Sequence, residues 1–341
     1  MRIFCNAQNL VLIFGKIKHE HLYLSNYYIM LFFCLTKPRY SSIIYWVIIM
    51  LKTIKPFIKW AGGKSQLLDD IRKKYPDKID KYCEPFVGGG AVLLDILSNF
   101  SPEQVLINDI NPELINTYSQ IRDNVDEIID FLEKMQSEFW ALDKDERKTY
   151  YYGKRDRFNE LILKSVQTAE QAALFIFLNK TCFNGLYRVN AKGLYNVPMG
   201  DYKKPPICDP ENLRYISGLL QNTKIKCGDY RECAEFIDSD TFVYIDPPYR
   251  PLNETSSFTS YAKTEFGDQQ QIELGHFIDE ISAKGAKVVA SNSDPKNTND
   301  SDDFFDVLYG KYIINRVQAT RMINSKSSGR GALNELLICN F

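Results

Sequence analysis

Hydrophobic residues along this chain gather in short runs that polar turns separate. Seven of these runs are rich in apolar or β-branched side chains, a pattern typical of strands buried in a sheet. The predicted strands are residues 82–86, 104–108, 223–227, 241–245, 287–292, 312–320 and 335–340. Apolar positions with helical spacing lie between several of them. Strands that alternate with helices predict an α/β fold with a doubly wound, mostly parallel sheet.

The last two predicted strands are joined without a helix. Their connection contains the segment 325–331, which is rich in Ser and Gly. A connection of this kind predicts a hairpin, so we expect the last strand to run antiparallel to the others.

More than a hundred residues separate the second predicted strand from the third. The predicted helices of the chain are residues 92–97, 111–122, 125–140, 150–163, 169–178 and 269–284. Most of them fall in this long connection, which becomes loop-rich from residue 181 to 210. Because connections in α/β folds are normally short, we expect residues 111–222 to form an inserted subdomain. Residues 50–110 and 223–341 then form one domain.

Residues 1–49 differ from the rest of the chain. Their apolar bursts are interrupted by polar residues, so none reaches the ~18 apolar residues of a membrane span, and no small-residue cleavage site follows. The sequence that begins at Met50, Met-Leu-Lys-Thr-Ile-Lys-Pro, looks like an ordinary protein N-terminus. The preferred interpretation is a gene start placed too early, with Met50 as the true first residue; a peripheral membrane anchor is the alternative.

Composition limits the class of partner and site. The 341 residues have a net charge of −1, which divides into +4 for residues 1–49 and −5 for the remainder. Because most of the chain is mildly acidic, nucleic acid would have to bind to local basic loops. The eight cysteines form no C-x-x-C pair and there are three histidines, which disfavours a metal site and a Cys-His nucleophile. Reduced thiols indicate a cytoplasmic protein, in the cytosol or nucleoid.

The tetrapeptide Asp246-Pro-Pro-Tyr249 follows a fully apolar strand. Two prolines end the strand and carry no N–H, so the carbonyls of Asp246 and Pro247 are available to a ligand. A carboxylate beside a carbonyl suits an amine that donates two hydrogens, and Tyr249 offers a ring on which a base can stack. Ligands bind at such strand ends in α/β sheets. The alternative is a simple strand-ending turn.

A glycine-rich turn, Glu84-Pro-Phe-Val-Gly-Gly-Gly90, follows the first predicted strand. It lacks the G-x-G-x-x-G spacing of dinucleotide sites. Asp109 stands 19 residues beyond Gly90, where an acid commonly holds ribose hydroxyls. Together they indicate a cofactor that carries adenosine without phosphates, and Glu84, Phe86 and Gly88 are the candidate loop contacts. A tight turn with a surface acid is the alternative.

The segment Phe57-Ile-Lys-Trp-Ala-Gly-Gly-Lys64 places an aromatic ring and a cation around two glycines. Trp60 and Lys64 suit an amino-acid carboxylate or an apolar cofactor tail, although Trp60 alone is more typical of a core residue.

Polar and aromatic residues interleave in two stretches of the long connection, residues 179–190 and 196–205. Arg reads guanine edges, Asn reads adenine and Lys holds phosphate, so these stretches suit DNA; a solvated loop is the alternative. Lys203, Lys326 and Arg330, which lie among Pro, Ser and Gly, are predicted phosphate contacts.

The motifs FIKWAGGK, EPFVGGG, NDINPELI, FNGLYRVN with NVPMGDYKKP, and DPPY occur in that order over residues 54–341. In this the chain resembles the Dam family of DNA adenine methyltransferases, which act on GATC. The resemblance implies a Rossmann-like methyltransferase sheet with a target-recognition insertion. It assigns Trp60, Lys64 and Asp109 to the cofactor, Asp246 to the junction of cofactor and base, and Tyr249 to base stacking.

The same resemblance matches the target-recognition positions of the family to Lys59, Asn184, Leu186 and Arg188. Phe183 departs from the pattern, because the Escherichia-type member has a tyrosine there.

The resemblance implies S-adenosylmethionine as cofactor and double-stranded DNA as partner. Neither a metal nor a membrane is expected, and a restriction endonuclease is a possible functional partner. Methylation of cytosine, of RNA adenine or of a protein amide remains open, as does a DNA-binding regulator with an inactive fold. The Asp of DPPY and the FNGLYR loop favour DNA adenine.

Overall fold

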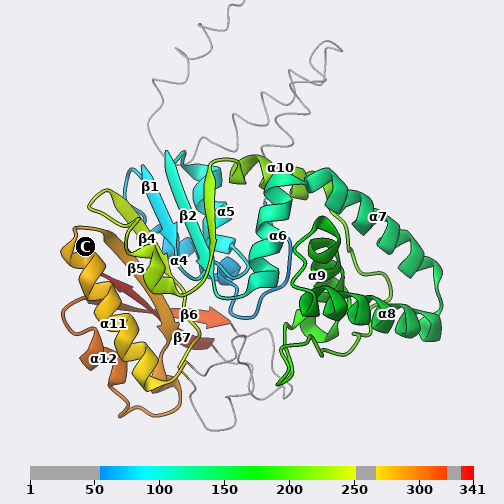
Figure 1. Cartoon of the computed structure of the whole chain (residues 1–341). Coiled ribbons are helices and arrows are strands. Elements are labelled where there is room, and N and C mark those ends of the chain that lie inside the picture. Colours follow the sequence, from blue (N-terminus) through cyan, green and yellow to red (C-terminus); the bar gives the residue numbers. More distant parts are fainter. Residues whose placement is uncertain (1–53, 251–265, 321–331) are drawn as a thin grey trace, which may run out of the picture. The chain divides into compact units, whose positions relative to one another are not determined.

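A seven-stranded sheet forms the centre of the computed structural model, which describes residues 54–250, 266–320 and 332–341 (Figure 1). The strands are β1 (Lys81–Glu84), β2 (Gln104–Asp109), β3 (Thr223–Cys227), β4 (Thr241–Ile245), β5 (Lys287–Ser293), β6 (Ile313–Thr320) and β7 (Ala332–Cys339). Their order across the sheet is β3-β2-β1-β4-β5-β7-β6. The expectations for residues 1–49, Lys326 and Arg330 lie outside the described residues.

The predicted α/β fold is confirmed. β3, β2, β1, β4 and β5 pair in parallel, while β7 pairs antiparallel with both β5 and β6. β7 is therefore the antiparallel last strand that the sequence predicts, and it lies inside the sheet with β6 at the edge. β3 and β4 have the predicted bounds, whereas β7 begins three residues before the predicted Glu335.

Successive strand residues point to opposite faces, and each face has its own cover. On one face Val243, Ile245 and Val288 pack with α11 (Asp268–Ala283) and α12 (Phe304–Leu308). On the other, Phe242, Tyr244 and their neighbours pack with four helices. These are α4 (Leu68–Arg72), α5 (Ala91–Asn99), α6 (Pro112–Asp123) and α10 (Pro210–Leu220). The central strand β4 is thus buried on both faces, which explains its fully apolar sequence.

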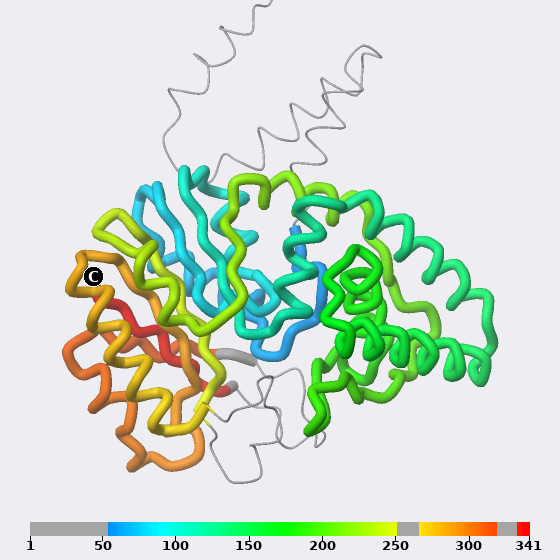
Figure 2. Tube along the Cα trace, viewed as in Figure 1, coloured from blue at the N-terminus to red at the C-terminus, as the bar shows by residue number. Residues whose placement is uncertain are grey.

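The long connection contains α6, α7 (Val125–Ala141), α8 (Lys144–Leu163), α9 (Ala169–Thr181) and α10. Figure 2 shows α7, α8 and α9, in green, gathered beside the sheet. Their rings interlock at Phe139–Phe177 and Phe158–Phe175, so they share the core of the adjoining face. α10 was not predicted, although Asp209 caps it and Pro210 opens it, a standard helix start.

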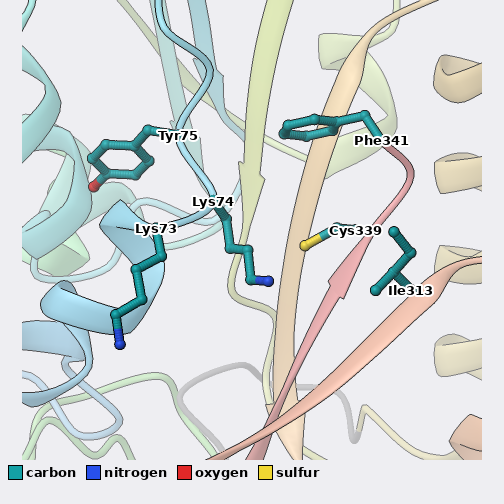
Figure 3. Close-up of a pocket in the computed structure, with 6 residues that line it drawn as sticks. All are labelled: Lys73, Lys74, Tyr75, Ile313, Cys339 and Phe341. Atoms are coloured by element: carbon teal, nitrogen blue, oxygen red, sulfur yellow. The ribbon is translucent and has the colours of Figure 1, made fainter.

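A pocket lies at the opposite end of the sheet from the carboxyl ends of the parallel strands. Figure 3 shows its lining side chains. They are Lys73, Lys74, Tyr75, Ile313, Cys339 and Phe341. Ile313 begins β6 and pairs with Cys339 at the end of β7, which places this pocket away from the DPPY motif.

Candidate active site

The candidate residues gather where the parallel strands end. β1 ends at Glu84, β2 at Asp109, and β4 runs directly into Asp246. β7 enters this edge from the opposite direction and brings Glu335 into register with Ser293 at the end of β5. Because these strand ends share one edge, residues from 84 to 335 reach a common site.

Asp246 is held by two donors on one oxygen. Ser291 Oγ and Lys64 Nζ both lie 2.9 Å from its Oδ1. Among the described residues both contacts fall on Oδ1, which leaves Oδ2 as the acceptor for an incoming donor. Tyr244 donates to Ser291 Oγ at 3.2 Å, so the carboxylate is oriented by a chain of hydrogen bonds from two strands.

Lys64 lies at the centre of the site, with its side chain only 4% exposed. Besides its ion pair with Asp246, its ammonium donates to the Gly62 carbonyl at 2.6 Å. It lies 3.9 Å from Glu335 Oε2 and 4.8 Å from the centre of the Tyr249 ring. The sequence assigned Lys64 to the cofactor alone, and its ion pair with Asp246 was not foreseen.

The Asp246–Tyr249 segment, here called the DPPY turn, is fixed at its far end as well. The Tyr249 hydroxyl donates to Glu335 Oε2 at 2.7 Å. Burial raises the pKa of that hydroxyl well above its ordinary value, and the neighbouring Asp246 and Glu335 add to the rise, so Tyr249 stays a donor. The buried Gln271 donates to the Pro248 carbonyl at 3.0 Å. The sequence gave no signal for Gln271 or Glu335, since neither belongs to a motif.

The glycine turn after β1 is packed against Trp60. A Cβ on Gly88 would lie 2.9 Å from the Trp60 ring, and φ at Gly88 is +47°, so only glycine suits this position. Gly88 N–H donates to Asp109 Oδ2 at 3.1 Å, and its carbonyl accepts from the Tyr118 hydroxyl at 3.0 Å. The structure therefore brings Trp60, Gly88 and Asp109 together, and their assignment to a cofactor stays a prediction.

Asp109 combines a structural contact with spare acceptor capacity. Its two oxygens accept from the N–H groups of Gly88 and Asn111. Burial raises the pKa of this carboxyl, and those two N–H groups oppose the rise. A carboxylate offers about four acceptor sites, so a ribose diol can still be held. Phe86 stacks on Tyr230 beside it, at 5.1 Å between ring centroids, which adds a flat apolar surface for an adenine ring.

Glu84 is the last residue of β1, directly before the glycine turn. Its side chain is buried and accepts from the Tyr82 hydroxyl at 2.7 Å. Burial raises the pKa of the Glu84 carboxyl well above its ordinary value; the Tyr82 hydrogen bond opposes this rise and the nearby Asp246 adds to it. Glu84 therefore supports the glycine turn from the core.

The predicted recognition positions among the described residues lie in the recognition segment, residues 181–204, and in the irregular stretch before Trp60. Asn179, at the end of α9, joins the two. Its amide accepts from Lys59 N–H and donates to the carbonyls of Lys59 and Gly185 at 2.8–3.0 Å. Tyr187 stacks on Trp60 at 5.9 Å, which links the segment to the glycine turn. The sequence did not single out Asn179.

Within the recognition segment, Asn184, Arg188 and Lys203 are exposed and Leu186 is half-buried. Asn184 has a left-handed backbone, with φ at 55°, followed by Gly185 at 65°. Arg188 Nε donates to Asn196 Oδ1 at 2.8 Å. These positions present polar groups outward from one loop, while Phe183 is 52% exposed beside them.

A metal-binding cluster and a membrane-spanning helix were both sought among the described residues. Within residues 54–250, 266–320 and 332–341, no cluster of three or more His, Cys, Asp or Glu side chains is placed to bind a metal ion. No helix in the same part of the chain has the length and apolar character needed to cross a membrane.

Comparison with known proteins gives a consistent result. Residues 60–323 match the family model described as D12 class N6 adenine-specific DNA methyltransferase. A type II methyltransferase of Methanocaldococcus jannaschii is 48% identical over 294 residues, covering 84% of this chain and 99% of the relative. DNA adenine methylases of Haemophilus influenzae and Escherichia coli are 38% and 33% identical, covering 83% and 84% of this chain and 92% and 95% of the relatives.

Proposed function

The chain belongs to the D12 class of N6 adenine-specific DNA methyltransferases, and from that premise we propose that it uses S-adenosylmethionine to methylate adenine within GATC in double-stranded DNA. The observation that carries the proposal is the Asp246 carboxylate, whose Oδ1 is held by Ser291 and Lys64, while within the described part of the chain no contact falls on Oδ2. Relatives named DNA adenine methylase support adenine in DNA as the target, and the resemblance of the motifs to the Dam family supports GATC. We place the enzyme in the cytoplasm with its DNA, and a restriction endonuclease as a functional partner is part of the same proposal.

The residues around the glycine turn fit the cofactor. Asp109 would hold the ribose hydroxyls, Phe86 would face the adenine ring, and the Gly88 backbone would allow close approach. Trp60 and Lys64 would contact the methionine part. When bound, S-adenosylmethionine supplies a methyl group already activated by its sulfonium.

Asp246 and Pro247 would hold the reacting amine. Asp246 Oδ2 and the Pro247 carbonyl accept its two hydrogens, which directs the nitrogen lone pair toward the methyl group. Holding the reactants in this way contributes about 7–11 kcal/mol to a bimolecular step. No strong base is required before transfer, because the methylated amine cation is very acidic and loses its proton readily.

Tyr249 would receive the target base outside the duplex. Extrusion of a base costs a few kcal/mol. Stacking on an aromatic ring returns about 1–3 kcal/mol of this cost. The hydrogen bond from Tyr249 to Glu335 fixes the plane of the ring on which the base would stack.

The recognition segment would read the sequence. Arg188 has the planar donor fork that bridges two guanine acceptors. Asn179 holds the backbone of Lys59 beside the segment that carries Asn184 and Leu186. Lys203, Lys326 and Arg330 would contact phosphates, which position the protein without specifying a base.

The test is to express the protein in a strain that lacks adenine methylation. Its DNA is digested with enzymes that distinguish methylated from unmethylated GATC, and N6-methyladenine is measured by mass spectrometry. We expect N6-methyladenine and a GATC methylation pattern, both absent with Asp246→Ala. N6-methyladenine at another sequence would refute the GATC assignment, and methylcytosine would refute the proposed substrate.

A further inference from the structure

The DPPY site, formed by Lys64, Glu335 and the DPPY turn, carries more negative than positive charge. Asp246 and Lys64, 2.9 Å apart, are together neutral. Glu335 adds a second carboxylate on the other side of the same ammonium, with 3.9 Å between Lys64 Nζ and Glu335 Oε2. The cluster of Asp246, Lys64 and Glu335 therefore has a net charge of −1.

The Glu335 carboxylate lies within reach of both Tyr249 and Lys64. β7 places it opposite Ser293, and its side chain is 22% exposed, compared with 4% for Lys64. Its Oε2 accepts from the Tyr249 hydroxyl at 2.7 Å and faces the lysine ammonium. One carboxylate thus contacts the proposed stacking ring and the counterion of the proposed amine acceptor.

Methyl transfer places a charge beside this cluster. As the bond between N6 and the methyl carbon forms, N6 gains positive charge, while the electron pair of the breaking sulfur–carbon bond stays on sulfur. A neutral Asp246–Lys64 pair would stabilise that charge weakly, whereas a cluster with a net charge of −1 stabilises it more strongly.

We propose that Glu335 is a positioning residue for the methyl transfer: it shares the Lys64 ammonium, so that Asp246 keeps its negative character, and it fixes the Tyr249 ring. This inference rests on the proposed roles of Asp246 and Tyr249. Nothing in the reaction passes through Glu335 itself.

The two contributions can be separated by substitution. Glu335→Gln keeps an oxygen that accepts from Tyr249 but removes the charge. Glu335→Ala removes both the acceptor and the charge. Tyr249→Phe removes only the hydrogen bond. Glu273→Gln is the matched control, because it removes the same charge from an exposed position on α11, away from the cluster.

The experiment measures single-turnover methylation of a GATC duplex at saturating S-adenosylmethionine and enzyme. Base extrusion is followed separately by the fluorescence of 2-aminopurine at the target position, and affinities for DNA and cofactor are measured by titration. For Glu335→Gln we expect the methylation rate to fall about tenfold, through loss of one charge-assisted contact, with affinities and fluorescence unchanged. For Glu335→Ala and Tyr249→Phe the fluorescence should also change, and by the same amount.

A wild-type methylation rate in Glu335→Gln would overturn the proposal, as would a loss of rate in that variant that follows weaker DNA or cofactor binding. An equal loss of rate in Glu273→Gln would also overturn it, since the effect would then be one of overall charge. Asp246→Ala distinguishes a failure of the Glu335 proposal from a failure of the proposed function. If Asp246→Ala stays active, the active site itself is wrongly assigned.

Discussion

The DPPY site and the recognition segment are built in opposite ways. The site stands on strand ends, and each of its polar groups has several partners; Lys64 alone contacts Asp246, Gly62 and Tyr249. The recognition segment is a loop in which Asn184, Arg188 and Lys203 are exposed above buried residues such as Tyr187 and Tyr195. Amide contacts, such as that of Asn196 with Arg188, shape its exposed part. The difference suits the two proposed tasks. Chemistry requires a geometry fixed before the substrate arrives, whereas side chains that read DNA can become ordered when they contact it.

Asn179 and the Trp60–Tyr187 stack connect the two regions. Substitutions on each side of this junction should therefore separate loss of chemistry from loss of sequence discrimination.

The largest effect is expected for Asp246→Ala. Loss of the preorganised acceptor should lower single-turnover methylation by about 10²–10³-fold. DNA affinity should change little, because Asp246 contacts the amine rather than phosphate. Titration of DNA binding beside the rate measurement checks both statements. A rate near that of the wild type would contradict the assigned chemistry.

Asn179→Ala should disturb the junction itself. The backbone groups of Lys59 and Gly185 lose their partner, so we expect the free energy of unfolding to fall by about 2–3 kcal/mol. Discrimination against single-base variants of GATC should fall as well. Asn212→Ala is the matched control, because Asn212 also bonds both backbone groups of one residue, Lys55, outside the recognition segment. Urea unfolding and methylation of variant sites distinguish the two; equal discrimination in both variants would show that the junction does not matter.

Asp109→Ala tests the cofactor side of the site. Loss of hydrogen bonds to a charged acceptor should weaken S-adenosylmethionine binding by about 1.5–3 kcal/mol. Calorimetric titration of the cofactor measures this directly. Unchanged affinity would mean that Asp109 serves only to hold the Gly88 N–H.

Arg188→Ala tests the recognition segment. We expect a cost of about 1–3 kcal/mol on GATC and weaker discrimination at one base pair. Lys203→Ala, as a phosphate contact, should instead weaken all sequences alike and reduce the salt dependence by about one unit. Methylation rates on GATC and each single-base variant, at two salt concentrations, separate them. A uniform loss in Arg188→Ala would make that residue a phosphate contact too.

The smallest effect on activity is expected at Lys180, next to Asn179. Burial, with a contribution from the nearby Lys59, lowers its pKa from 10.5 to about 8. Between these two values the unfolded chain binds more protons than the folded one, so stability should rise with pH in this window. Lys180→Met should remove that rise and stabilise the protein at pH 7 by up to about 3 kcal/mol. Urea titrations at pH 7 and pH 10 check the sign, and a steeper rise in the variant would contradict it.

Local patterns determined what the sequence could predict. Apolar runs fixed β3 and β4 to the residue, and the hairpin predicted the direction of β7. The DPPY, glycine and FNGLYR motifs identified groups that the structure brings close together. Glu335, Ser291, Gln271 and Asn179 were missed, because each acts through a partner that is distant in sequence: 86 residues separate Tyr249 from Glu335. Such pairs follow from the strand order, which no local pattern encodes.

The place of β7 in the sheet also sets an order for assembly. Among the described strands, β6 pairs only with β7, so it has no position until β7 inserts beside β5. Before then, β5 with its apolar core is an open edge of the kind that recruits other chains. Insertion of β7 closes this aggregation-prone edge and delivers Glu335 to Lys64 in the same event. During synthesis, a nascent chain that has not yet made β7 is therefore prone to self-association and lacks the second carboxylate of its site.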